Sequence, residues 1–112
     1  MTVQLWKQAE TEALFMGRVT DYATLRGWEW MHIQPGLTER GRYRTPVSGP
    51  LGSGWPDLIM VRGSDLLAVE LKAEKGKLTV LQRRVLNTLE QALVEVQVWR
   101  PSDWDRIIER LA

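Results

Sequence analysis

Three residues in the middle of the chain, Asp57, Glu70 and Lys72, have the types and spacing of a hydrolytic metal site. With Gly63 and Ser64 as the two turn residues of a β-hairpin, the strand register places Asp57 opposite Glu70. Directly opposed carboxylates lie about 4.5–5.5 Å apart at Cβ and repel each other unless something lies between them. Carboxylate oxygens suit Mg²⁺ or Mn²⁺, which bind few protein carboxylates and complete their shell with water and phosphate oxygens. The pattern therefore predicts a divalent-cation site that acts on a phosphate ester, provided that no β-bulge or longer turn shifts the register.

Lys72 follows Glu70 by two residues, so strand alternation places both side chains on the same face of the sheet. There the ammonium group could help to activate a water molecule or neutralise charge that develops on a phosphate. An ordinary cross-strand ion pair would also explain Glu70 and Lys72, and Asp57 could be a turn residue after Pro56. The apolar sequence at 68–71 favours the metal site over a structural ion pair, because a charged residue in a core strand is costly unless it has a partner or a function.

Glu12, Gln82 and His32 could complete the site from other elements. Glu12 falls on the apolar stripe of the first predicted helix, so we expect it to point inward and to orient water or hold a second cation. A glutamate at the edge of that stripe is the alternative. Gln82 closes a Thr79-x-x-Gln82 capping box, or its amide holds a water or phosphate oxygen. For His32 a structural role is favoured over a catalytic one.

The elements that must position these residues follow the order αβββαβα. The pattern predicts a helix over 4–26, a strand over 28–33, a hairpin of strands over 58–62 and 66–71, a helix from 79 to about 94, a strand over 95–100 and a final helix from 101. Gly27 stands where a helix C′ residue is expected. A long loop over 34–55, rich in glycine and proline, is either a substrate-contacting loop or a surface excursion. No repeat or linker divides residues 1–112, so one domain is expected.

Composition narrows the class of protein. The chain has 112 residues, of which 44% are hydrophobic and 26% charged, as in ordinary soluble globular proteins. It has no cysteine, which excludes disulfides and thiolate-bound metals. The first residues resemble neither a signal peptide nor a membrane span, so a cytoplasmic protein is the expectation.

A net charge of +1 does not by itself indicate nucleic-acid binding. The basic residues gather in two segments, and either cluster alone is also explained by a solvated charged surface. The candidate phosphate contacts in these segments are Arg40, Arg42, Arg44, Lys75, Lys77 and Arg84, with His32 as a further candidate.

The chain resembles the PD-(D/E)xK nuclease superfamily in Glu12, Gly54-Trp55-Pro56-Asp57, Glu70-Leu71-Lys72 and Gln82. Within that superfamily it is similar to the VRR-NUC family, the virus-type replication and repair nuclease domain. The motifs that carry this similarity are Gly27-Trp28, His32, Pro56-Asp57-Leu58, Gly76-Lys77-Leu78-Thr79, Gln82 and Val98-Trp99-Arg100-Pro101. The resemblance extends from about residue 12 to residue 112.

This resemblance implies an α/β fold with a restriction-endonuclease-like αβββαβ core, in which helices flank a mixed central sheet, here followed by a C-terminal helix. It implies a DNA endonuclease with Mg²⁺ or Mn²⁺ bound by Asp57, Glu70 and the backbone carbonyl of Leu71. Lys72 would be the catalytic lysine, Glu12 and Gln82 would complete the catalytic set, and Glu12 is a further candidate metal ligand. No organic cofactor is expected.

The resemblance points to single-domain members of the family, which are often encoded by phages. It implies a homodimer that cuts branched DNA such as four-way Holliday junctions. The length of this chain fits that type. A flap, nick or restriction-type nuclease that uses the same site is the first alternative. A DNA-binding module without catalytic activity is the second.

Overall fold

The computed structural model describes residues 10–33, 36–37, 43–44 and 47–112. Its elements are α1 (Glu12–Leu25), β1 (Glu29–His32), β2 (Gly36–Leu37), β3 (Tyr43–Arg44), η2 (Pro50–Gly52), β4 (Leu58–Arg62), β5 (Asp65–Leu71), α2 (Val80–Gln91), β6 (Glu95–Trp99), η3 (Pro101–Asp103) and α3 (Trp104–Leu111). Apart from the short pieces β2, β3, η2 and η3, the elements follow the predicted αβββαβα order.

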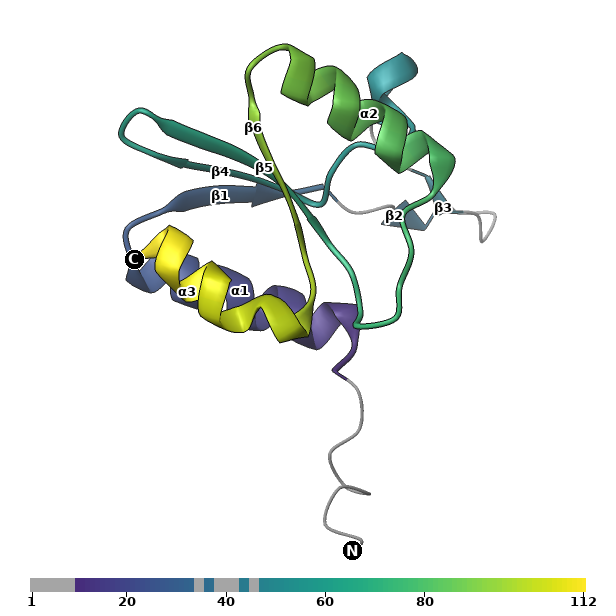
Figure 1. Ribbon diagram of the computed structural model, residues 1–112. Helices are drawn as coiled ribbons and strands as arrows, with labels where there is room; N and C mark the ends of the chain where they lie inside the picture. The colour runs from purple at the N-terminus through teal and green to yellow at the C-terminus, as the bar shows by residue number, and fades with distance from the viewer. Residues whose placement is uncertain (1–9, 34–35, 38–42, 45–46) are drawn as a thin grey trace, which may run out of the picture.

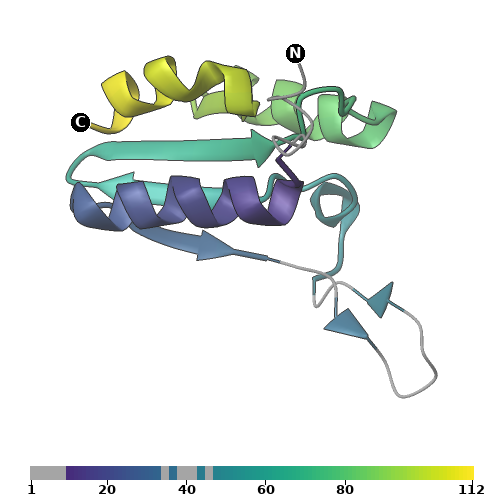
Figure 2. The ribbon, with the colours of Figure 1, turned by 90° about the horizontal axis from the view of Figure 1, so that it is seen from below.

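The main sheet of the described residues has four strands in the order β1-β4-β5-β6. β1, β4 and β5 are antiparallel, whereas β6 runs parallel to β5, so the sheet is mixed as predicted. Figure 1 shows α1 and α3 on one face of this sheet and α2 on the other, and the view onto the first face shows α1 and α3 in front of the strands (Figure 2). The fold is therefore α/β, with helices on both faces of the sheet.

The hydrophobic core lies between the sheet and the two helices α1 and α3. Its buried members are Phe15, Val19, Ala23, Trp28, Leu58, Met60, Leu67, Val69, Leu71, Trp99, Ile107 and Leu111. In β5 the alternate residues Leu67, Val69 and Leu71 belong to this core, so strand alternation turns Glu70 toward the α2 face. A carboxylate on the central strand thus lies on the opposite side of the sheet from the apolar core.

Helix α1 begins later than the pattern predicts. The Oγ1 of Thr11 accepts a hydrogen bond from the N–H of Leu14 at 3.1 Å, which makes Thr11 the N-cap. Residue 10 and Thr11 are not helical, so the prediction that the helix covers them is wrong; residues 1–9 lie outside the described part. Gly27, with φ of 83°, ends the helix as predicted.

Helix α2 is capped by Thr79, as predicted, but it ends at Gln91 rather than near residue 94. The backbone turns at Leu93, where φ is 66°, and the N–H of Val94 bonds back to the carbonyl of Leu89 at 3.1 Å. This left-handed closure stops the helix although the apolar pattern continues. None of the helices in the described ranges is long and apolar enough to cross a membrane.

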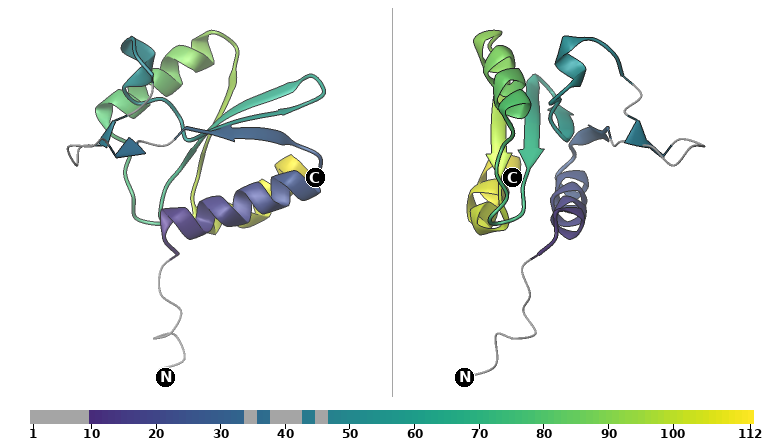
Figure 3. Two further views of the ribbon diagram at one scale, coloured as in Figure 1. Left: turned by 180° about the vertical axis from the view of Figure 1, so that it is seen from behind. Right: turned by 90° about the vertical axis from the view of Figure 1, so that its right-hand side faces the viewer.

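The predicted loop over 34–55 contains secondary structure. β2 and β3 form a short antiparallel pair with Gly36 opposite Arg44, and η2 forms a turn that starts at Pro50. The η2 turn lies alongside α2 (Figure 3), where a guanidinium nitrogen of Arg84 donates to the carbonyl of Pro50 at 2.7 Å. The segment that leads to Asp57 is thereby tied to α2.

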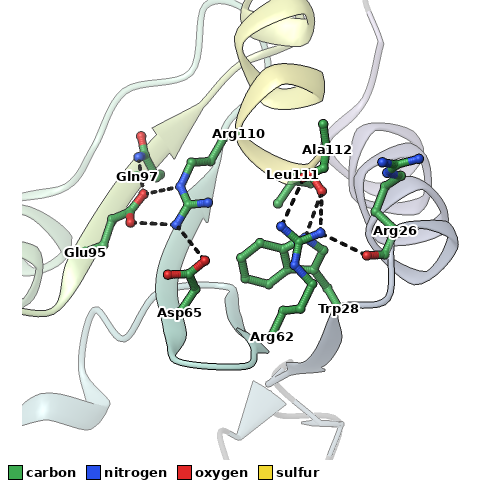
Figure 4. A network of polar contacts seen from close by, with 9 residues as sticks. All are labelled: Arg26, Trp28, Arg62, Asp65, Glu95, Gln97, Arg110, Leu111 and Ala112. Carbon is green, nitrogen blue, oxygen red and sulfur yellow. Dashed lines mark hydrogen bonds and ion pairs between the residues drawn. The ribbon is translucent and has the colours of Figure 1, made fainter.

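Arg62, at the turn end of the β4–β5 hairpin, holds this end in place (Figure 4). Its guanidinium lies 4.5 Å from the centre of the Trp28 ring. It also donates to the backbone oxygens of Arg26, Leu111 and Ala112, each at 3.0 Å. The hairpin turn is therefore fastened to the ends of both helices that cover the core.

Candidate functional site

The register of the β4–β5 hairpin brings Asp57 and Glu70 opposite each other. Gly63, with φ of 59°, is the first of two turn residues, a position that favours glycine in a tight hairpin. The pairs run from Arg62 with Asp65 to Leu58 with Val69, so the next position places Asp57 against Glu70. The register that the two-residue turn predicted is the register observed.

Glu70 is buried, with 2% of its surface exposed, and two donors contact one of its oxygens. The Nζ of Lys72, itself only 8% exposed, lies 3.3 Å from Oε2 of Glu70. The side-chain amide of Gln82 donates to the same Oε2 at 3.1 Å. The structure thus brings the predicted acid, lysine and glutamine together around one carboxylate oxygen.

The pKa of Glu70 is raised from 4.5 to about 7. Burial is the largest cause, and the neighbouring Asp57 carboxylate adds to it by repulsion and by a hydrogen bond that favours the protonated form. Lys72 opposes this rise only in part. The site therefore carries more negative charge than its lysine offsets, and a bound cation would favour the ionised carboxylate.

Pro56 and Asp57 together end the strand ladder beside the site. Backbone-bonded pairs alternate outward from the turn, so position 56 would be the next partner of Leu71. Proline has no N–H to donate to the Leu71 carbonyl. The N–H of Leu71 bonds instead to Oδ2 of Asp57 at 2.8 Å. The Pro-Asp pair thus fixes the Asp57 carboxylate while β4 supplies no donor to the Leu71 carbonyl.

A cleft of about 380 Å³ opens beside Asp57 on the side of α1. It is lined by Glu12, Ala13, Met16, His32, Asp57 and Leu71. Glu12 is exposed at the start of α1, so the expectation that it points inward is wrong, and it lies at the edge of the apolar stripe, which was the alternative. The structure nevertheless brings Glu12 and half-buried His32 to the same cleft as Asp57.

The donor set fits a hard divalent cation that keeps part of its water shell. Within the described residues, no group of three or more His, Asp and Glu side chains could hold a metal ion. Asp57 and Glu70 face each other with two carboxylates, and Leu71, whose carbonyl receives no hydrogen bond from β4, lines the cleft beside Asp57. Mg²⁺ binds through one or two carboxylates together with water and substrate oxygens, so this sparse set suits it.

The candidate phosphate contacts differ in what the structure shows of them. Arg40 and Arg42 lie outside the described residues, and only the backbone of Arg44 is described. Lys75 and Lys77 are exposed on the segment between β5 and α2.

Gly54 positions the site, a role that its place in the Gly54-Trp55-Pro56-Asp57 motif did not by itself indicate. Its φ is 98°, and a Cβ there would come within 2.5 Å of the backbone carbon and oxygen of Leu81. Only glycine allows the segment before Asp57 to approach the first turn of α2 this closely. The signal was present in Gly54-Trp55-Pro56-Asp57, but the partner in α2 could not be read from the sequence.

A comparison with models of known protein families found a match. The family model for the VRR-NUC domain matches residues 47–103, about half of the chain. The matched residues include Asp57, Glu70, Lys72 and Gln82, whereas Glu12 and His32 precede them. No curated protein matches the chain. The chain therefore belongs to the VRR-NUC family of nuclease domains.

Proposed function

We propose that this VRR-NUC chain is a divalent-metal-dependent DNA endonuclease with Asp57, Glu70 and Lys72 at its catalytic centre. One observation carries the proposal: buried Glu70 lies opposite a second acid and beside a buried lysine. Two adjacent carboxylates in a poorly solvated place are costly unless a cation pairs with them. We take residues 1–112 as one domain, which the shared core of α1, the sheet and α3 supports.

Asp57, Glu70 and the backbone carbonyl of Leu71 would hold Mg²⁺ or Mn²⁺. When bound, the cation stabilises the charge that develops on the phosphate and lowers the pKa of water. Lys72 places a positive charge beside the reacting phosphate, and Gln82 keeps the Glu70 carboxylate oriented. Water attacks the phosphorus in line with the leaving 3′-oxygen, and the broken strand carries 5′-phosphate and 3′-hydroxyl ends.

The cleft on the α1 side would receive the scissile phosphate and its water. Glu12 and His32 line it together with Asp57, which supports the proposal that Glu12 orients water or holds a second cation. Lys75 and Lys77, exposed on the segment that follows the catalytic lysine, would contact DNA phosphates without reading bases. Arg40, Arg42, Arg44 and Arg84 are proposed as further phosphate contacts, with His32 as an additional candidate.

We propose branched DNA, such as a four-way junction, as the preferred substrate and a homodimer as the active form. Two cuts on a symmetric junction require two centres, and closed two-fold symmetry is the commonest assembly of identical chains. Flap, nick or restriction-type cleavage by the same centre remains the alternative specificity. Incubation of the chain and Mg²⁺ with four-way, flap and linear duplex DNA decides between them, and equal cutting of all three contradicts junction preference.

The direct test of the site compares the wild-type chain with Asp57→Ala in Mg²⁺ and in Mn²⁺. We expect the variant to bind DNA but not to cut it, because the cation loses a ligand while the basic surface is unchanged. Asp65→Ala is the matched control, since it removes an exposed acid at the other end of the same hairpin. Equal nicking by wild type and Asp57→Ala would show that the site is assigned wrongly. A wild-type chain that binds DNA without cutting it would support a non-catalytic module.

A further inference from the structure

The N-terminal cap of α2 contacts the proposed catalytic centre directly. The Oγ1 of Thr79 accepts a hydrogen bond from the backbone N–H of Gln82 at 3.1 Å. In return, the backbone N–H of Thr79 donates to Oε1 of Gln82 at 2.9 Å. The other end of the Gln82 amide, Nε2, donates to Oε2 of Glu70 at 3.1 Å. The sequence left open whether Gln82 caps the helix or serves the site, and the geometry shows contacts of both kinds.

The two ends of the Gln82 amide have different partners, and this fixes its orientation. Thr79 presents an N–H, which needs the amide oxygen, whereas the Glu70 carboxylate needs the amide NH₂ group. Turning the amide by 180° would place NH₂ against N–H and oxygen against carboxylate. Because both contacts would then be repulsive, the cap selects the one orientation that donates to Glu70.

The same contact determines how the Glu70 carboxylate is presented. Gln82 and Lys72 both approach Oε2, at 3.1 and 3.3 Å. Two donors on one oxygen restrict rotation of the carboxylate. A carboxylate held in this way is pre-organised for a cation, as outer hydrogen bonds are known to orient metal-binding carboxylates.

Gly54 links this arrangement to the second acid. Its backbone lies against Leu81 and the N–H of Gln82, where no side chain would fit. The segment 54–57 and the first turn of α2 are therefore in close contact, so the cap is held in place relative to Asp57 as well as Glu70.

We propose that Thr79 is a positioning residue of the catalytic centre, which acts through Gln82 to orient Glu70 for the cation. This inference rests on the proposed function and deepens it, because it makes the start of α2 part of the metal site. Thr79 contacts neither substrate nor cation in this scheme. Its effect on cation affinity passes entirely through the Gln82 amide.

The test is a double-mutant cycle read by Mn²⁺ affinity, measured by titration calorimetry on the full chain without DNA. Gln82→Met keeps the side-chain length but removes both amide contacts, and we expect it to weaken Mn²⁺ binding about 10-fold, as loss of an outer-shell partner does. Thr79→Ala keeps the backbone N–H that orients the Gln82 amide but removes the hydroxyl that holds the backbone of Gln82 against Thr79, so the N–H and the amide are less well aligned, and we expect a smaller weakening. Thr79→Ser keeps the hydroxyl and should restore wild-type affinity.

The decisive comparison is Thr79→Ala in the two backgrounds. If Thr79 acts through Gln82, Thr79→Ala weakens binding in the wild type but has no further effect when Gln82 is already Met. An equal weakening in both backgrounds, or no weakening in either, overturns the proposal. Asn87→Gly is the control, since it loosens the exposed middle of α2 without touching the cap, and it should leave Mn²⁺ affinity unchanged.

Circular dichroism and thermal unfolding of each variant show whether it is folded, so that a lost fold is not read as lost affinity. A wild-type chain that binds no Mn²⁺ contradicts the proposed function itself, and the inference falls with it. Normal wild-type binding that Gln82→Met does not change contradicts the inference alone.

Discussion

The two ends of the β4–β5 hairpin differ in how their acidic side chains are balanced by basic ones. At the turn end Arg62 lies opposite Asp65 in the strand register, and Arg110 contacts Glu95 at 2.8 Å and Asp65 at 3.9 Å (Figure 4). At the other end, one position beyond the last pair of the ladder, Asp57 lies opposite Glu70, so two acids face each other. The turn end balances its charges within the protein, whereas the other end retains an excess of negative charge.

The pKa values of Glu95, near the turn end, and Glu70, at the other end, are shifted in opposite directions. The hydrogen bonds from Arg110 hold the pKa of Glu95 below its usual value. Burial and the Asp57 carboxylate raise the pKa of Glu70 to about 7. A protein can hold a glutamate in a β-strand at low cost when it supplies an arginine. Where a second acid stands in place of the arginine, as at Asp57, we propose that a divalent cation bound by the carboxylate oxygens balances the charge.

Removing the charge of each glutamate in turn should give the largest contrast. We expect Glu70→Gln to reduce the initial rate of plasmid nicking in Mg²⁺ by roughly 10³-fold, since a cation contributes several kcal/mol to the transition state. Glu95→Gln should cut at the wild-type rate, because Glu95 belongs to the balanced end. A Glu70→Gln variant that nicks as fast as Glu95→Gln would show that the two ends do not differ in function.

The pH dependence of stability should separate the same two residues. The folded pKa of Glu70, about 7, exceeds the ordinary pKa of a glutamate, 4.5, so the folded state binds the proton more tightly. Without metal, the free energy of unfolding should therefore fall as pH rises from 4.5 to 7, by on the order of 3 kcal/mol. Glu95 has a lowered pKa, so its contribution is present above pH 4.5 and is lost below it.

Urea unfolding in EDTA at a series of pH values measures this effect. Glu70→Gln should abolish the fall between pH 4.5 and 7, whereas Glu95→Gln should preserve it. Added Mn²⁺ should reverse the fall, because cation binding favours the ionised carboxylate and stabilises the state that binds it. A fall of equal size in Glu70→Gln would assign the titration to another group.

Arg62→Met tests whether the turn end serves stability alone. The guanidinium donates to three backbone oxygens and stacks on Trp28, partly exposed to solvent. We expect its loss to lower the free energy of unfolding by about 1–2 kcal/mol. The nicking rate of the folded variant, measured well below its melting temperature, should equal that of the wild type. A large drop in rate with stability intact would mean that the two ends are coupled.

The sequence predicts the parts of the fold that local chemistry controls. The Gly63-Ser64 turn determines the register that opposes Asp57 to Glu70, and Thr79 marks the start of α2. The end of α2 escaped prediction, because Leu93 adopts a left-handed conformation that favours glycine. The contact of Gly54 with Leu81 and the two-sided bonding of Gln82 also escaped, since both depend on how α2 packs against segments distant in sequence.

The smallest effect is expected at Asp65, the residue whose place in the hairpin mirrors that of Asp57. Its contact with Arg110 is 3.9 Å long and half of its side chain is exposed, so water already solvates both charges. Exposed pairs of this kind contribute about 0–1 kcal/mol, so Asp65→Asn should shift the urea midpoint only slightly and leave Mn²⁺ affinity unchanged. Asp57→Asn, the same chemical change at the other end of the ladder, should abolish tight Mn²⁺ binding. Equal Mn²⁺ affinities for the two variants would mean that charge balance along the hairpin does not explain where the cation binds.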